Sequence, residues 1–105
     1  MNTQKEFEKI VRQAVRLRKQ KNQDYGDSFL KSFQKYGKEA LFFDLKRKWD
    51  RIENMTAPKQ GLVYPVTDET IEETLFDLGI MCFNGMICFK DKHERKNKRA
   101  QQKNK

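Results

Sequence analysis

The stretch that decides the fold is "TDETIEETLFDLGIMCFNGMICF", residues 67–89. Its apolar residues recur at three- and four-residue steps, which is the periodicity of an amphipathic helix: Ile71, Leu75, Leu78, Cys82, Met86 and Phe89. Thr67 is a good N-cap, and the acids Asp68 and Glu69 suit the positive end of a helix. The pattern predicts a helix that starts near Thr67 and continues through Phe89.

The rest of the chain repeats this spacing in three further segments, which predict helices over residues 3–20, 28–36 and 38–55. Between the first two, "KNQDYGDSF" (residues 21–29) favours a turn, and "TAPKQGLVYPV" (residues 56–66) is an irregular connection. No segment shows the two-residue period of a strand. We therefore expect an all-α fold, a small antiparallel bundle of three long helices and one short helix.

The composition sets the size of the core. A chain of 105 residues fits a single domain, which we place at residues 1–90, and only 36% of its residues are hydrophobic while 36% are charged. Such a chain buries little apolar surface as a monomer. We therefore expect a homo-oligomer, a dimer or a tetramer, to complete the bundle.

The net charge of +8 is concentrated at the C-terminus. Residues 90–105 contain eight Lys or Arg and two acids, so this segment carries +6 and the rest of the chain +2. Because residues 91–105 have almost no apolar side chains, we expect a disordered tail there. Two interpretations stay open: a solubilising tail, or a segment that attracts nucleic acid or phosphate without sequence preference.

Other residue types exclude several classes of function. Cys82 and Cys88 lie in an apolar stretch without a metal-binding spacing, so we expect buried free thiols in a reducing compartment. His93 is the single histidine, which leaves no material for His-based zinc sites or Ser-His and Cys-His catalysis. No stretch resembles a signal peptide or a membrane span. We expect a cytoplasmic protein that does not enter membranes.

Carboxylates form a ladder along the fourth predicted helix. Glu69, Glu73 and Asp77 follow at four-residue steps, and Asn84 continues the same stripe. Oxygen ligands of this kind suit Mg²⁺. The alternative is an acidic first turn that favours the helix dipole, which explains Glu69 and Glu73 but leaves Asp77, in the middle of an apolar helix, unexplained.

The third predicted helix, "FDLKRKWDRIE", offers the opposite charge. Asp44, Lys48 and Arg51 share one face, so Lys48 and Arg51 can bind phosphate oxygens. The alternative is an intrahelical ion pair between Asp44 and Lys48. Trp49 belongs to the apolar face, and we expect it to pack in the core.

Three motifs in this order, "KNQDYGDSF", "FFDLKRKWDRI" and "DETIEETLFDL", resemble the nucleotide modification associated domain 1 family, which occurs largely in phages and prophages. The resemblance spans about residues 21–83. That family is in turn similar to the MazG-like all-α nucleoside triphosphate pyrophosphohydrolases. The resemblance implies a Mg²⁺-dependent (deoxy)nucleoside triphosphate pyrophosphatase in phage nucleotide metabolism or DNA modification, located in the host cytoplasm.

Together with the carboxylate ladder and the basic face of helix 38–55, the resemblance predicts roles for individual residues. Glu73 and Asp77 would be catalytic, and the Mg²⁺ ligands would be Asp44, Glu69, Glu73 and Asp77. The nucleotide would contact Lys21, Asp24, Tyr25, Lys48, Arg51 and Asn84. Two departures from the family pattern favour an alternative, a phage protein that binds or sequesters nucleotides without hydrolysis. The motif "FFDLKRKWDRI" has only two carboxylates, Asp44 and Asp50, on different faces. Gly79, Ile80 and Met81 replace the usual Ala-Asn-Tyr.

Overall fold

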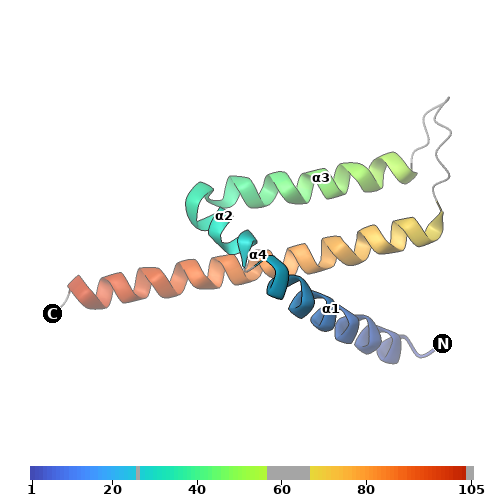
Figure 1. The fold of residues 1–105 in the computed structure, drawn as a ribbon, viewed down its shortest axis with the longest axis horizontal. Coiled ribbons are helices and arrows are strands. Elements are labelled where there is room, and N and C mark those ends of the chain that lie inside the picture. Colours follow the sequence, from blue (N-terminus) through green and yellow to red (C-terminus); the bar gives the residue numbers. More distant parts are fainter. Residues whose placement is uncertain (26, 57–66, 104–105) are drawn as a thin grey trace.

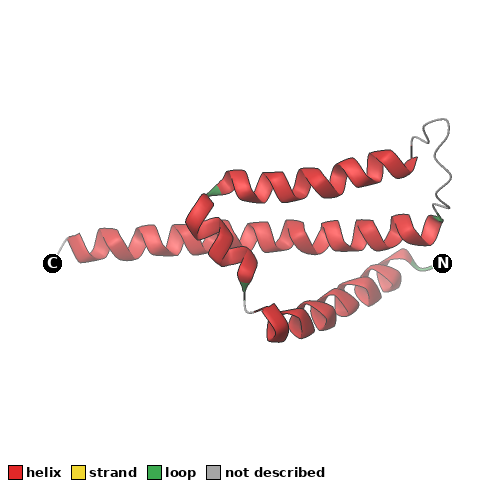
Figure 2. Ribbon diagram, turned by 45° about the horizontal axis from the view of Figure 1, so that its top comes forward, coloured by secondary structure: helices red, strands yellow, loops and turns green. Residues whose placement is uncertain are grey.

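The structure is a computed structural model that describes residues 1–25, 27–56 and 67–103. It contains the helices α1 (Thr3–Tyr25), α2 (Ser28–Tyr36), α3 (Lys38–Thr56) and α4 (Asp68–Lys103). The described residues include no strand (Figure 2), which confirms the all-α prediction. The predicted irregular connection falls on residues 57–66, which lie outside the described residues.

The helices form an open arrangement around α4 (Figure 1). α3 runs antiparallel beside the first half of α4, and α2 crosses α4 near its middle. The pair α3 and α4 makes the most extensive contact, whereas α1 and α4 make the smallest of the four main helix contacts. α1 lies obliquely beside the first half of α4, and the last part of α4 projects beyond the other helices.

Local signals in the sequence fix several helix ends. Gly37 ends α2 with φ of 79°, a conformation that favours glycine, and its N–H donates to the Phe33 carbonyl at 2.7 Å. Thr67 Oγ1 accepts a hydrogen bond from the Thr70 N–H at 3.2 Å, so the predicted N-cap of α4 is confirmed. Asp27 precedes α2 in the left-handed region with φ of 55°, without a capping hydrogen bond from its side chain.

The core lies where α2, α3 and α4 meet. Among the described residues, its buried apolar side chains are Phe33, Ile52 and Cys88. The rings of Phe33 and Phe89 pack edge to face with centroids 5.2 Å apart. The side chain of Thr74 is also buried, and its hydroxyl donates to the Thr70 carbonyl within the same helix at 2.9 Å. A core this small agrees with the composition.

Two helices are longer than the sequence predicted. α1 continues to Tyr25 and α2 begins at Ser28, so residues 21–25 and 28–29 of "KNQDYGDSF" are helical. α4 continues to Lys103 through the basic segment where we expected a disordered tail. Residues 86–103 contain no glycine or proline and are rich in Lys, Arg and Gln, so an existing helix extends through them at little cost. The ion pair between Arg95 Nε and Asp91 Oδ2, at 3.1 Å, supports that extension.

Two predictions about burial were wrong. Trp49 is 52% exposed, because the face of α3 that packs against α4 is centred on Leu45, Lys48 and Ile52. Its Nε1 donates a hydrogen bond to Glu53 Oε1 at 2.8 Å. Cys88 is buried as expected, but Cys82 is exposed. Separately, none of the described helices has an apolar stretch long enough to cross a membrane.

Candidate functional site

A polar cleft of about 250 Å³ lies where the C-terminal part of α1, the start of α2, and the middles of α3 and α4 come together. Its charged lining consists of three cations, Arg18, Lys21 and Lys48, and one carboxylate, Asp77. The other lining residues are Asn22, Ser28, Phe29, Ile80, Met81 and Asn84. We call this the cationic cleft.

Arg18 is held in place from two sides. Its Nε donates to Asn84 Oδ1 at 2.7 Å, which joins α1 to α4, and its guanidinium carbon lies 5.4 Å from the centroid of the Phe29 ring. These contacts fix one edge of the guanidinium. The remaining N–H groups of a guanidinium form a planar fork that suits phosphate oxygens.

Lys48 and Asp77 face each other across the cleft, from α3 and α4. Lys48 Nζ lies 3.8 Å from Asp77 Oδ2, and the two side chains are 32% and 39% exposed. The intrahelical alternative of the sequence analysis does not form, because Asp44 instead lies 3.9 Å from Arg47 Nη1. A pair this open contributes little to stability, so Lys48 can exchange Asp77 for a ligand anion at low cost.

The last turns of α1 supply Lys21 and Asn22. Asn22 Nδ2 donates to Asp27 Oδ1 at 2.7 Å, so the turn before α2 is tied back to α1. The extension of α1 beyond the predicted end is what carries Lys21 to the cleft. Asp24 and Tyr25 lie in the same last turn, but their side chains are outside the described part of the structure.

The predicted metal ligands do not gather in one place. Asp44 lines a separate small hollow with Ser32 and Asn84, and Glu69 is exposed at the start of α4. Glu73 lines a hollow between α1 and α4, together with Asp77. Among residues 1–25, 27–56 and 67–103, no group of three His, Cys, Asp or Glu side chains could hold a metal ion. In the described part of the chain, Asp77 is the one carboxylate that lines the cleft, and it faces a lysine. The Mg²⁺ site stays a prediction.

Four of the predicted site residues do come together: Lys21, Lys48, Asp77 and Asn84. Arg51 is exposed on α3 and does not line the cleft. Sequence reasoning missed Arg18. A signal was available, since Arg18 continues the apolar series Phe7, Val11 and Ala14 at helical spacing, and a cation at a core-facing position invites a functional explanation.

No protein-family model, curated protein or solved structure matches the chain. The cationic cleft is therefore interpreted from its own geometry and chemistry.

Proposed function

We propose that the cationic cleft binds the phosphate groups of a nucleotide. The observation that supports this most strongly is the convergence of Arg18, Lys21 and Lys48, from two distant segments of the chain, on a space with one opposing carboxylate. Such an excess of positive charge in a concave site attracts anions and raises their local concentration. Arginine binds phosphate as a fork and lysine as a point charge, so the cleft offers both modes.

The remaining lining residues suit the other parts of a nucleotide. Phe29, Ile80 and Met81 give an apolar surface for a base or sugar, and Asn22, Ser28 and Asn84 add amide and hydroxyl groups that can orient it. The resemblance of "KNQDYGDSF" and "FFDLKRKWDRI" to a nucleotide-associated family supports a nucleotide over a simple anion, since these motifs supply Lys21 and Lys48.

We further propose that one chain binds nucleotide without metal-dependent hydrolysis. Mg²⁺ chemistry needs several oxygen ligands around one point, and the carboxylates Glu69, Glu73 and Asp77 are spread along α4 instead of closing around a site. The pyrophosphatase suggested by the resemblance makes a different prediction, which is release of pyrophosphate from a deoxynucleoside triphosphate in the presence of Mg²⁺.

Calorimetric titration with the common deoxynucleoside triphosphates, in Mg²⁺ and again in EDTA, tests the proposal. Lys48→Ala is expected to weaken binding about 10-fold, a loss of ~1.4 kcal/mol, because it removes one charge-assisted contact. Lys46→Ala is the matched control: Lys46 lies on the same helix, outside the cleft, and pairs with Asp50 at 3.2 Å.

Equal losses from the two variants would count against the cleft as the site. Affinity that vanishes in EDTA, together with pyrophosphate release, would overturn metal-free binding and favour the pyrophosphatase.

A further inference from the structure

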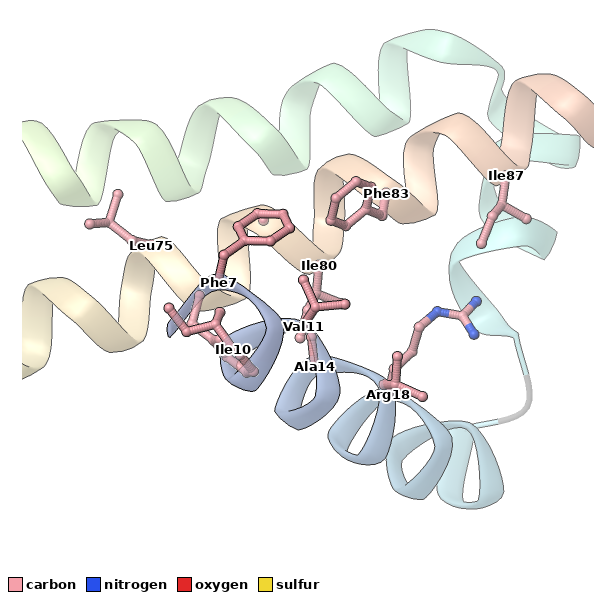
Figure 3. Close-up of a pocket in the computed structure, with 12 residues that line it drawn as sticks. Phe7, Ile10, Val11, Ala14, Arg18, Leu75, Ile80, Phe83 and Ile87 are labelled. Carbon is pink, nitrogen blue, oxygen red and sulfur yellow. The ribbon is translucent and has the colours of Figure 1, made fainter. Parts of the chain in front are cut away.

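An apolar groove of about 380 Å³ runs between α1 and α4 (Figure 3). Phe7, Ile10, Val11 and Ala14 from α1 and Ile80 and Phe83 from α4 line the same space. Several of these side chains lie open to solvent in the single chain, with Phe7 60% and Phe83 59% exposed. Exposed apolar surface that is contiguous across two helices marks an interaction site in a soluble protein.

The chain exposes more surface than a compact monomer of its mass. A compact monomer of 12.6 kDa exposes about 6,200 Å², whereas this chain exposes 9317 Å². Its radius of gyration is 17.9 Å, against roughly 13 Å for a compact domain of this length. The projecting end of α4 accounts for part of the excess, and the groove contributes part of the exposed apolar surface. An obligate dimer interface removes roughly 1,000–2,500 Å² from each copy, so the excess is large enough for one.

The charges beside the groove are complementary between α1 and α4. α1 carries seven Lys or Arg and three acids, whereas residues 68–89 of α4 carry five acids and no Lys or Arg. α1 of one copy laid along α4 of another therefore brings opposite charges together at the rim while the apolar side chains meet at the centre. A two-fold arrangement repeats this contact twice and presents the same face on both copies.

We infer that the groove between α1 and α4 is covered by the same face of a second copy of this chain. The thin core led us to expect an oligomer from the sequence, and the structure assigns the face that forms it. The dimer buries apolar surface on the α1 side of α4, in addition to the core of Phe33, Ile52 and Cys88. This inference does not depend on the proposed nucleotide site, although Arg18 lines both the groove and the cationic cleft.

Analytical ultracentrifugation of the full chain tests the inference. The unaltered protein is expected to sediment with twice the single-chain mass of 12.6 kDa, and its melting temperature is expected to rise with protein concentration. Phe83→Glu, in the groove, is expected to raise the dissociation constant at least ~10-fold. Phe43→Glu is the matched control, because Phe43 is also an exposed phenylalanine, at 64%, but lies on α3 outside the groove.

Two results would overturn the inference: a folded single-chain mass for the unaltered protein at every concentration, or a dimer that Phe43→Glu dissociates and Phe83→Glu leaves intact. If Phe83→Glu fails to fold, Phe7→Glu, at a groove residue of α1 that is 60% exposed, takes its place in the comparison with Phe43→Glu.

Discussion

Asp77→Asn separates the two interpretations of the cleft, because they predict opposite signs. If the cleft binds phosphate directly, Asp77 is a competing anion: its Oδ2 lies 3.8 Å from Lys48 Nζ, so a phosphate that takes Lys48 must approach the carboxylate. If Asp77 is a metal ligand or a catalytic carboxylate, the same change abolishes function. Asparagine keeps the size of the side chain and removes only its charge.

The magnitude follows from Coulomb's law. Two like charges about 6 Å apart at an effective dielectric constant of ~50, suited to side chains that are a third exposed, repel by about 1 kcal/mol. Asp77→Asn should therefore tighten nucleotide binding about 5-fold, measured by calorimetry in EDTA. Because these groups are partly exposed, the gain should shrink as salt is added.

Asp50→Asn is the control for this experiment. Asp50 also pairs with a lysine, at 3.2 Å from Lys46, but it lies outside the cleft, so its loss should leave affinity unchanged. Weaker or unchanged binding in the Asp77→Asn variant, with the fold intact by circular dichroism, would refute direct phosphate binding next to Asp77.

Three further predictions concern the packing of the single chain. Cys82 is exposed, whereas burial and the nearby Asp91 carboxylate raise the pKa of the Cys88 thiol. A thiol reagent at neutral pH should therefore modify Cys82 first. Equal rates of modification at the two cysteines, followed by mass spectrometry, would contradict the burial of Cys88. The same raised pKa predicts how stability depends on pH. The free energy of unfolding should stay constant below the ordinary thiol pKa of 9.0 and fall as the pH rises above it, since the thiol of the unfolded chain ionises first. A free energy of unfolding, measured in urea, that rises through this pH range would contradict the prediction. A Cβ on Gly85 would lie 3.1 Å from Leu41 Cδ2, so Gly85→Val should lower the free energy of unfolding by about 2 kcal/mol in urea, and an unchanged value would contradict the close packing of α3 on α4.

The sequence predicted the elements that have strong local signals. Gly37 marked the end of α2 and Thr67 marked the start of α4, because a left-handed glycine and a hydroxyl cap act within one turn. The ends of α1 and α4 were predicted too early. "KNQDY" and the basic segment are polar but lack a residue that stops a helix, so polarity alone was a poor signal for a helix end.

The sequence predicted part of the candidate site. Lys21, Lys48, Asp77 and Asn84 came from motifs on separate segments, and they meet in the structure. The carboxylate ladder shares a helix stripe, but a shared stripe does not bring carboxylates around one point: Glu69 and Asp77 are two turns apart. Arg18 continues the apolar stripe of α1, which was the available signal, but its contact with Asn84 depends on the angle between α1 and α4, which no periodicity encodes.

Apolar periodicity identified the apolar face of α1 but not what that face packs against. The apolar stripe of α1 was correctly identified, but the sequence does not say whether it packs on its own chain. In the structure α1 lies obliquely to α4 and contacts it only sparsely, so much of the stripe stays exposed (Figure 1). We infer that a second copy of the chain covers it, and a partner of this kind cannot be read from packing within one chain.

The most direct test of the central claim is a crystal structure of the chain soaked with a non-hydrolysable deoxynucleoside triphosphate analogue. We predict phosphate oxygens within hydrogen-bond distance, about 3 Å, of Arg18, Lys21 and Lys48. An analogue bound elsewhere, for example along the basic end of α4, or a cleft that stays free of ligand at saturating concentration, would contradict the assignment of the cationic cleft as a nucleotide site.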